Sequence, residues 1–343
     1  MILQGLACRT PPERYSQADC LAILRASGAF GRLKSRSRLL LEKVLTGENG
    51  IDFRHFAMSG LEGLFDLGAG ELNRGFEREA PALASAALGD ALEKAEVLPG
   101  EVDALLVCTC TGYLCPGVSS HVAERMGMRR DVFLGDMVGL GCGAAIPMLR
   151  QAAALVRADP GTTVACVAVE ICSAAFYLDD DPGVLISLCL FGDGAAATVW
   201  RGGAAEPEDL RCDGFDTLHL PEKRDLLRFE NADGRLRNRL HRSVPEHAAA
   251  AVKTLFDRNG RPDAAVIAHA GGRDVIDEVA RSIDREDLPD SRAVLRECGN
   301  MSSPSVLFAL DEHLEARPSG PLQLWGTSFG AGFACHSCRF TRG

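Results

Sequence analysis

The 343-residue sequence has no apolar run near the 18 residues that a membrane-spanning helix needs. Its N-terminal stretch lacks a charged segment followed by an apolar one, so no secretory signal peptide is expected. Basic residues are not in excess: 37 Lys and Arg against 47 Asp and Glu give a net charge of −10. Because binding to nucleic acid phosphates needs clustered positive charge, nucleic acid is not expected to be the main partner.

Cysteine is also too scarce for a disulfide-stapled domain, since 13 in 343 residues is about 4%, against the 8–10% of that class. Cys335 and Cys338 form a CxxC and Cys108 and Cys110 a CxC, but neither is followed by a second pair at zinc-finger spacing. We therefore predict a cytoplasmic protein with free thiols, most of them small buried apolar residues, and no metal site. A structural or redox-active CxxC at Cys335–Cys338 is the alternative.

The composition, 46% apolar and 24% charged, is that of a globular protein with a large core. At roughly 150 residues per domain, the length suggests about two domains. Buried strands are predicted at 102–110, 162–171 and 263–270, and helices at 78–97, 119–128, 245–257 and 300–316. This alternation predicts an α/β fold with covered sheets and two similar halves, 1–202 and 203–343. The polar, arginine-rich segment 203–243 is expected to be a solvated loop or hairpin region between them.

Cys142 is the candidate nucleophile. It stands in VGLGCGAAIPMLR (138–150), between a predicted strand and a predicted helix. Glycines at 139, 141 and 143 permit a tight turn with positive φ, which would place the thiol at the helix N-terminus. There the unpaired N–H groups and the helix dipole lower a thiol pKa, and a thiolate attacks carbonyl and thioester carbons. The alternative is a buried cysteine in a packing turn.

Two further polar residues stand at glycine-marked ends of apolar elements. His269 ends the apolar strand in VIAHAGG, and Asn300 lies between Gly299 and a predicted helix. A core histidine and a helix cap or turn asparagine are the structural alternatives. Together with Cys142, however, they supply the partner and the oxyanion donors that a cysteine nucleophile needs.

At these residues the sequence resembles the type III polyketide synthases, the chalcone-synthase-like branch of the thiolase superfamily. The resemblance covers nearly the whole chain, and GNMSS together with FGDGAA is its most specific part. The blocks that carry it are TPPERYSQ (10–17), CTGYLCPG (110–117), GLGCGAAIPMLR (139–150), LFGDGAAA (190–197), IAHAGG (267–272), GNMSSPSVLFALDE (299–312) and SFGAGF (328–333).

The resemblance implies a thiolase-like, five-layered αβαβα fold and a homodimer. It implies that Cys142 accepts an acyl group from CoA and that His269 and Asn300 complete a Cys–His–Asn triad, with His269 stabilising the thiolate as an ion pair. Malonyl-CoA then extends the chain by decarboxylative condensation, without a carrier protein, a metal or an organic cofactor; the CoA thioesters are substrates.

For the substrate, CTGYLCPG and the GRLRNRL–RSVP segment resemble bacterial alkylresorcinol and alkylpyrone synthases, which implies an alkyl or fatty acyl starter and a resorcinol or pyrone product. The implied cavity residues are Cys110, Thr111, Cys115 and Asn238. Cys115 stands where the family places a residue that reaches across the dimer interface; packing within the interface is the alternative. The family's bulky aromatic gatekeepers are expected near Leu210–Cys212 and Asn238, where no phenylalanine aligns cleanly, although Phe215 and Phe229 are near.

For CoA, the resemblance implies basic residues near the N-terminal helix, and the sequence offers a cluster there; a solvated helix face is the alternative. The residues expected to contact CoA are Arg32, Lys34, Lys43, Gly271, Gly272 and Ser302, with Arg36 and Arg38 in the same cluster.

Three other functions stay open at this point. A carrier-protein-dependent ketoacyl synthase III shares the triad and the fold. A non-catalytic thiolase-fold partner would be expected to lack a triad member, and none is missing here. A thiol redox or metal protein would use the cysteines.

Overall fold

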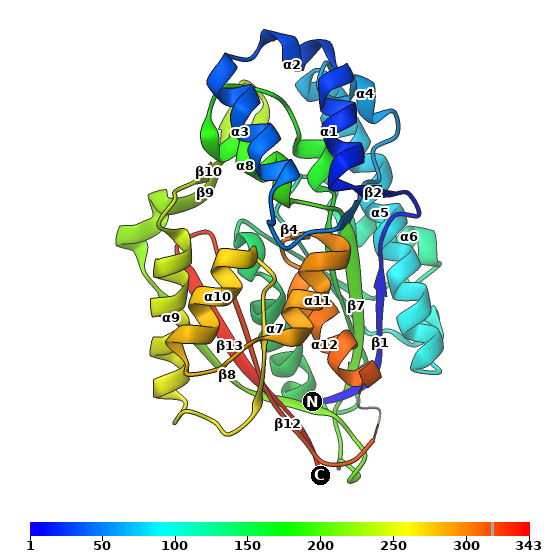
Figure 1. Ribbon diagram of the computed structural model, residues 1–343. Coiled ribbons are helices and arrows are strands. Elements are labelled where there is room, and N and C mark those ends of the chain that lie inside the picture. The colour runs from blue at the N-terminus through cyan, green and yellow to red at the C-terminus, as the bar shows by residue number, and fades with distance from the viewer. Residues whose placement is uncertain (317–318) are drawn as a thin grey trace.

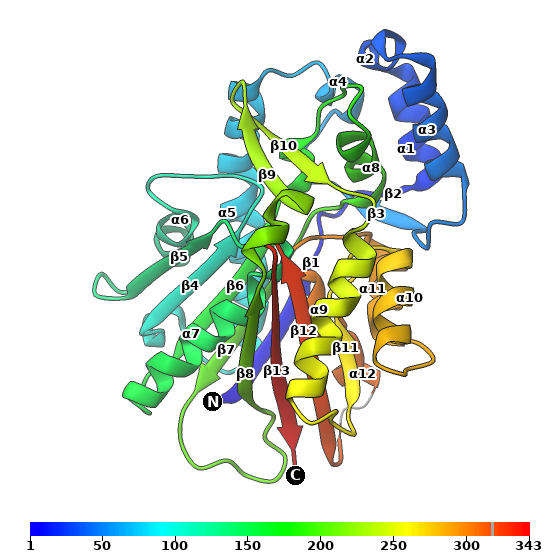
Figure 2. The ribbon, with the colours of Figure 1, turned by 90° about the vertical axis from the view of Figure 1, so that its left-hand side faces the viewer.

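The computed structural model describes residues 1–316 and 319–343. Within them, nine strands form one mixed sheet in the order β11-β12-β13-β8-β1-β7-β6-β4-β5 (Figures 1 and 2). The first half contributes β1 (Ile2–Arg9), β4 (Ala104–Thr109), β5 (Phe133–Val138), β6 (Val164–Glu170) and β7 (Gly194–Arg201). The second half contributes β8 (Arg211–His219), β11 (Ala265–Ala268), β12 (Leu322–Gly330) and β13 (Ala334–Arg342).

The two groups of strands repeat one pattern. In the first, β1, β7 and β6 pair antiparallel, and β4 joins β6 in parallel. In the second, β8, β13 and β12 pair antiparallel, and β11 joins β12 in parallel. The groups meet where Ile2 of β1 pairs with Arg211 of β8. The predicted boundary at 202/203 falls in the connection between β7 and β8, where the second pattern begins.

Helices cover the sheet on its outer faces and fill the space between its two halves (Figure 1). Helices α5 (Ala69–Lys94) and α6 (Val118–Met126) pack on the first half, and α9 (Val244–Arg258) packs on the second with α10 (Arg273–Ser282) beside it. Between the halves lie α7 (Ala145–Ala158), which contacts strands of both, and α12 (Ser305–Ala316), with α11 (Pro289–Cys298) against it. This order of layers is the αβαβα arrangement that the resemblance implies.

The remaining elements gather at one end of the sheet, at the top of Figure 1. The helices there are α1 (Gln17–Ala26), α2 (Gly28–Arg32), α3 (Ser35–Thr46), α4 (Leu61–Leu64) and α8 (Pro182–Leu190). Two small two-stranded sheets accompany them, β2 (Arg14–Ser16) with β3 (Phe53–His55), and the hairpin of β9 (Leu227–Ala232) with β10 (Arg235–Leu240). Short 3-10 turns are η1 (Pro99–Glu101), η2 (Gly141–Gly143), η3 (Cys172–Ala175) and η4 (Pro221–Leu226).

The apolar runs that predicted buried strands form the centre of the first half. Every residue of β4 and β6 is buried, and alternate side chains face different helical layers. Leu106 of β4 packs toward α7, whereas Leu105 packs in the cluster that contains the apolar face of α5. Both faces are covered, as the unbroken apolar runs predicted.

Two segments differ from the predictions. Part of 203–243 is the strand β8, paired with β1 and β13; Arg211 and Asp213 stay exposed there, which explains why its sequence resembles a loop. The helix predicted over 300–316 begins only at Ser305. Residues 300–304 form the turn that precedes it, and this turn carries two side chains of the site described below.

The cysteines behave as predicted within the described residues. All thirteen are free, and nine are buried, including Cys335 and Cys338 on β13. No group of His, Cys, Asp and Glu among the described residues could hold a metal ion. None of the helices in the described ranges combines the length and apolar character that crossing a membrane requires.

Candidate active site

Cys142 lies in η2, the turn that joins β5 to α7. Gly139 and Gly141 have φ values of +85° and +59°, in the left-handed region that favours glycine. A Cβ at Gly141 would lie 2.9 Å from the backbone nitrogen of Ala331, which is closer than side chains tolerate. These glycines therefore let the loop with Cys142 pack directly against the turn that follows β12.

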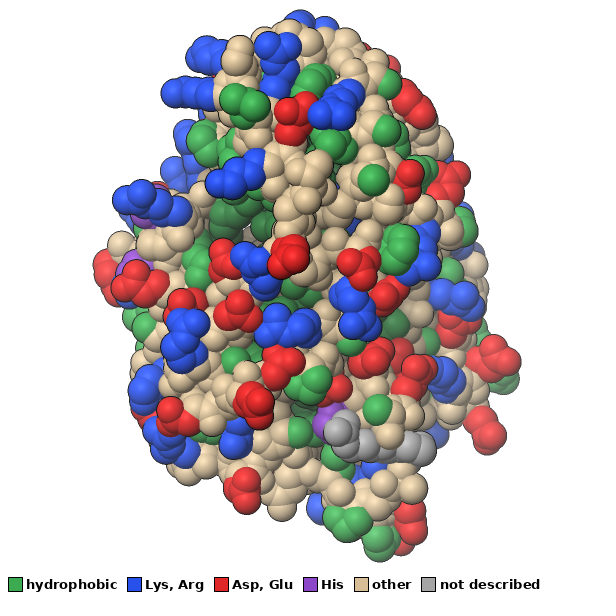
Figure 3. Space-filling model, viewed as in Figure 1, with side chains coloured by type: hydrophobic (Ala, Val, Ile, Leu, Met, Phe, Trp, Pro, Cys, Tyr) green, Lys and Arg blue, Asp and Glu red, His purple; other side chains and the backbone are tan. Residues whose placement is uncertain are grey.

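An outer cavity of about 900 Å³ leads to Cys142, and His269 and Asn300 also line it. His269 directly follows β11, and Asn300 follows α11 by two residues. The fold thus brings together three side chains that stand 127 and 31 residues apart in sequence (269 − 142 and 300 − 269). The outer cavity opens below α3, where Figure 3 shows a hollow with Lys and Arg side chains above it.

The imidazole of His269 is buried, and burial lowers its pKa to about 3. Its backbone N–H donates to the Thr327 carbonyl at 3.0 Å, and its ring packs edge-on against Phe329. No described residue forms a hydrogen bond with Nδ1. The ring is therefore neutral at pH 7, with one nitrogen able to accept a proton and the other able to donate one.

The amide of Asn300 is held on both sides. Its Nδ2 donates to the Gly271 carbonyl at 3.0 Å, and its Oδ1 accepts from the Ser302 backbone N–H at 2.8 Å. Because a side-chain amide has two N–H donors, one remains available after the bond to Gly271. The helix-cap alternative does not hold, since α12 begins five residues later.

Burial raises the pKa of the Cys142 thiol to about 12, and the nearby carboxylate of Glu170 adds to this effect. A hydrogen bond from Ser302 Oγ to Sγ, at 3.2 Å, acts in the opposite direction but is the weaker influence. The shifts of the Cys142 and His269 pKa values are both opposite to those that the predicted low thiol pKa and resting thiolate–imidazolium pair require. The reason is that desolvation outweighs the helix N-terminus, and that the neighbouring imidazole is itself neutral.

Removing the Ser302 hydroxyl is expected to raise the Cys142 pKa further, because that hydroxyl lowers it. A neutral hydrogen bond worth about 1 kcal/mol predicts roughly fivefold slower alkylation of Cys142 in Ser302→Ala at a fixed pH. The measurement is iodoacetamide labelling followed by peptide mass spectrometry. The exposed thiol of Cys115 serves as the control in the same sample, and equal labelling of Cys142 in both proteins would contradict the prediction.

Ser302 lies between two thiols. Besides its bond to Cys142, its hydroxyl lies 3.1 Å from the Cys110 Sγ, and its φ of +62° is unusual for a residue with a side chain. It is 1% exposed, so it faces the interior beneath Cys142 rather than the mouth of the outer cavity. Sequence reasoning placed Ser302 with CoA and did not anticipate this contact.

Glu170 is a buried residue that sequence reasoning missed. Its Oε2 accepts from Thr109 Oγ1, from the backbone N–H groups of Cys110 and Thr111, and from Thr111 Oγ1, at 2.8–3.1 Å. Its Oε1 accepts from Ser303 Oγ at 2.6 Å. One carboxylate thus ties the loop after β4 to the loop before α12. The only sequence signal was an acidic residue closing an otherwise apolar strand.

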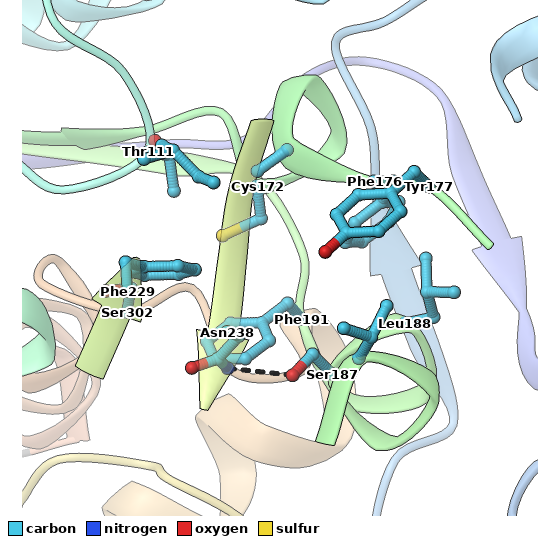
Figure 4. Close-up of a pocket in the computed structure, with 13 residues that line it drawn as sticks. Thr111, Cys172, Phe176, Tyr177, Ser187, Leu188, Phe191, Phe229, Asn238 and Ser302 are labelled. Carbon is cyan, nitrogen blue, oxygen red and sulfur yellow. Dashed lines mark hydrogen bonds between the residues drawn. The ribbon is translucent and has the colours of Figure 1, made fainter. Parts of the chain in front are cut away.

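An inner pocket of about 30 Å³ lies beyond the outer cavity (Figure 4). Thr111 and Asn238, predicted as cavity residues, line it together with Cys172 and Ser302. Asn238 Nδ2 donates to Ser187 Oγ at 2.7 Å, the contact drawn in Figure 4. Cys110 was also predicted as a cavity residue. It contacts Ser302, which lines the inner pocket, but does not line the pocket itself.

Of the two predicted positions of the aromatic gatekeepers, the one near Asn238 lines the inner pocket, and the one near Leu210–Cys212 needs correction. Leu210 and Cys212 are buried in the core near and within β8 and line neither cavity, whereas Phe191 lines both. Phe229 lines the inner pocket, and Phe215 packs against the core. Phe191 belongs to the LFGDG block that carries the family resemblance, but nothing in the sequence indicated that its side chain lines the cavities.

Cys115 is exposed and lines neither cavity within one chain. It stands in the loop between β4 and α6, two residues after Tyr113, whose side chain is 75% exposed. A role of Cys115 in the cavity would therefore require a second chain.

The basic cluster divides into two groups. Arg32 pairs with Asp66 at 2.7 Å and Lys34 with Asp180 at 3.6 Å, so both have acidic partners on the surface. Lys43, by contrast, lines the outer cavity. Arg242 and Arg273, together with Gly271 and Gly272, line the same cavity, and the two arginines were missed because they come from distant segments.

Comparison with known proteins gives the family. Residues 67–208 match the family model described as FAE1/Type III polyketide synthase-like protein, and residues 219–336 match chalcone and stilbene synthases, C-terminal domain. A 1,3,6,8-tetrahydroxynaphthalene synthase of Streptomyces peucetius subsp. caesius is 32% identical over 319 residues, which cover 88% of this chain and 82% of that protein. The chain belongs to the type III polyketide synthases. It is accordingly an acyltransferase of the condensing type.

Other relatives agree with this placement. A 3,5-dihydroxyphenylacetyl-CoA synthase of Streptomyces toyocaensis is 33% identical over 227 residues, covering 62% of this chain and 58% of that protein. The structure of a tetrahydroxynaphthalene synthase from Streptomyces coelicolor A3(2) matches with a TM-score of 0.88 at 24% identity, over 100% of this chain and 99% of that one. A polyketide synthase structure from the brown alga Ectocarpus siliculosus has a TM-score of 0.89 at 24% identity, covering 99% and 98%. The predicted thiolase-like fold is confirmed.

Proposed function

We propose that this type III polyketide synthase loads an acyl group from a CoA thioester onto Cys142 and extends it with malonyl-CoA. The observation that carries the proposal is the convergence of Cys142, His269 and Asn300 at one cavity. Lys43 and Arg242 line the same cavity and offer positive charge for the phosphates of CoA in a protein of net charge −10. Arg273 lines it as well and pairs with Asp274 at 3.1 Å.

Loading begins with two neutral groups. The Cys142 proton passes to the His269 imidazole as Sγ attacks the thioester carbonyl, so His269 acts as a general base. The CoA thiolate leaves and takes the proton back from His269, which returns to its neutral form. This sequence needs no resting ion pair, in keeping with the direction in which burial moves both pKa values.

Extension follows with malonyl-CoA. Its carboxylate leaves as CO₂, and the electron pair becomes an enolate whose thioester oxygen carries the charge. An N–H of His269 and the remaining N–H of Asn300 are the donors for that oxygen, and one such donor typically contributes about 10²–10³ in rate. The enolate carbon then attacks the acyl–Cys142 carbonyl and expels the Cys142 thiolate, so the chain grows by two carbons.

We propose an alkyl or fatty acyl starter, followed by cyclisation to a resorcinol or a pyrone. Two observations support this starter. The CTGYLCPG and GRLRNRL–RSVP segments resemble those of alkylresorcinol and alkylpyrone synthases. The outer cavity also has an apolar part, which Leu40, Val44 and Ile186 help to line. The second candidate is malonyl-CoA as its own starter. The relatives named for tetrahydroxynaphthalene and phloroglucinol favour it, because these names describe small aromatic products.

The deciding experiment is product mass spectrometry with malonyl-CoA and a panel of acyl-CoA starters, without any carrier protein. Incorporation of an alkyl starter supports the first candidate, whereas the same product with and without starter supports the second. Product formation only with a carrier protein would instead indicate a ketoacyl synthase III-like enzyme. No product under any condition would overturn the proposal.

We also infer that the protein works as a homodimer. The strand β5 ends the sheet, paired on one side only, and it exposes Phe133, Leu134 and Val138. An apolar edge strand is a ready surface for pairing with a second chain. A second chain bound at β5 would also contact the exposed loop that carries Tyr113 and Cys115.

Phe133→Asp is expected to convert the dimer to a monomer, since it places a charge in an apolar strand edge. The measurement is light scattering during size-exclusion chromatography. Leu98→Asp is the control, because Leu98 is also an exposed apolar residue, at 69% against 50% for Phe133, but lies outside β5. A wild-type mass of 36.6 kDa would refute the dimer itself.

A further inference from the structure

The hairpin β9–β10 forms a wall of both cavities although it stands outside the main sheet. Phe229, Leu236 and Asn238 face the inner pocket, whereas Leu227 and Leu240 line the outer cavity. A two-stranded hairpin alone has marginal stability in water. Its position therefore depends on what it binds.

A group of charged side chains, here called the ionic clasp, joins the hairpin to the start of α8. It consists of Asp181, Arg237, Arg239 and Glu230. Asp181 Oδ2 lies 3.0 Å from Arg237 Nη2 and 3.1 Å from Arg239 Nη1, and Arg239 Nη2 lies 2.7 Å from Glu230 Oε1. The Asp181 and Glu230 side chains are only 18% and 23% exposed, so solvent screens this network less than an open surface pair.

Asp181 uses its two carboxylate oxygens for different tasks. Oδ1 accepts from the Gly183 backbone N–H at 2.8 Å and caps α8, while Oδ2 receives the two arginines. Helix α8 is the opposite wall of the inner pocket, through Val184, Ser187 and Leu188. One carboxylate thus caps α8 and binds two arginines of the hairpin.

The walls also touch directly. A Cβ at Gly183 would lie 3.1 Å from the Leu240 backbone nitrogen, so β10 packs closely on the first turn of α8. The Asn238–Ser187 hydrogen bond closes the pocket further along (Figure 4). The resulting volume of about 30 Å³ holds one or two water molecules and no acyl chain.

We propose that Asp181 is a positioning residue, which through the ionic clasp limits how far the inner pocket opens and thereby the number of extensions. This rests on the proposed function, because a growing chain must enter the pocket by moving the hairpin away from α8. The clasp opposes that movement from the start of α8, where Asp181 also lines the outer cavity.

Asp181→Asn tests the proposal with little effect on the helix, since asparagine caps a helix as well as aspartate. The variant loses the negative charge that holds Arg239 to α8 and the nearer of two that face Arg237, because Asp179 Oδ2 also lies 3.5 Å from Arg237 Nη2. The expected result is a ratio of longer to shorter polyketides raised by about threefold. Loading of Cys142 by the starter acyl-CoA is measured by intact mass in the same samples, so that any effect of Asp181 on the outer cavity is separated from the product ratio. An unchanged or shortened product set overturns the proposal.

Salt provides a second test that needs no substitution. At 1 M NaCl the Debye length falls to about 3 Å, so the clasp weakens. Under saturating CoA thioesters, the wild-type product ratio is expected to move toward that of Asp181→Asn, which itself should respond little. Asp225→Asn is the matched control: it removes the exposed pair Asp225–Arg228 beside the hairpin and should not alter the products.

Hydrogen exchange separates this proposal from the proposed function. Residues 227–240 are expected to exchange faster in Asp181→Asn than in wild type, while α8 keeps its protection. If the protein makes no polyketide but residues 227–240 exchange faster in Asp181→Asn, the proposed function fails. The clasp is then shown to hold the hairpin in place. If the hairpin exchanges equally in both proteins, the clasp proposal fails whatever the activity.

Discussion

Cys142→Ala is expected to abolish chain extension, with a loss of about a thousandfold or more, because the acyl group then has no covalent attachment point. Decarboxylation of malonyl-CoA should persist in part, since its oxyanion donors come from His269 and Asn300. The measurement is radiolabelled malonyl-CoA incorporation alongside release of CO₂.

Cys20→Ala is the control, because Cys20 is another buried free thiol, on α1, that lines neither cavity. It should retain wild-type products. Polyketide formation by Cys142→Ala at a comparable rate would mean that another thiol is the nucleophile, and the neighbouring Cys110 would be the first to examine.

Glu170→Ala is expected to give the largest loss of stability among single polar substitutions at the site. The carboxylate is fully buried and accepts five hydrogen bonds, so its removal leaves several buried donors without a partner. Each buried donor left without its partner costs about 1–3 kcal/mol, and several are left here, so a loss of about 3 kcal/mol or more is expected. Urea unfolding at fixed protein concentration measures the free energy of unfolding.

Glu170→Gln is the informative companion variant. It keeps the shape and one acceptor oxygen, and a smaller loss than for alanine is expected. Because the site has mostly donors, the glutamine NH₂ group would face N–H and O–H groups, so the loss should not vanish. A change below about 1 kcal/mol for Glu170→Ala would show that the loops after β4 and before α12 hold without the carboxylate.

The buried neutral state of the site has a mechanistic consequence. Burial raises the pKa of the Cys142 thiol and lowers that of the His269 imidazole, so both shifts oppose proton transfer between them in the resting site. A dry site of this kind makes hydrogen bonds to the enolate oxygen stronger than they would be in water. The desolvation that keeps Cys142 neutral thus also strengthens the donors that extension requires.

The sequence by itself determined the family, the α/β class, the repetition of the pattern and the three residues of the candidate site. It could do so because these signals are local. Apolar runs such as 102–110 are buried wherever they lie, and glycines beside Cys142 and His269 mark turns that only glycine forms easily.

Only the tertiary structure decided the direction in which the pKa values of Cys142 and His269 move, because desolvation sums over neighbours from many segments. It also revealed Glu170 between two loops, the placement of Phe191 between the two cavities, and the pairing of Arg32 and Lys34 with surface carboxylates. The strand β8 was missed because its exposed polar residues resemble a loop, and only its partners β1 and β13 make it part of the sheet. The ionic clasp depends on Asp181 meeting a hairpin more than 50 residues away (237 − 181), which no local pattern can indicate.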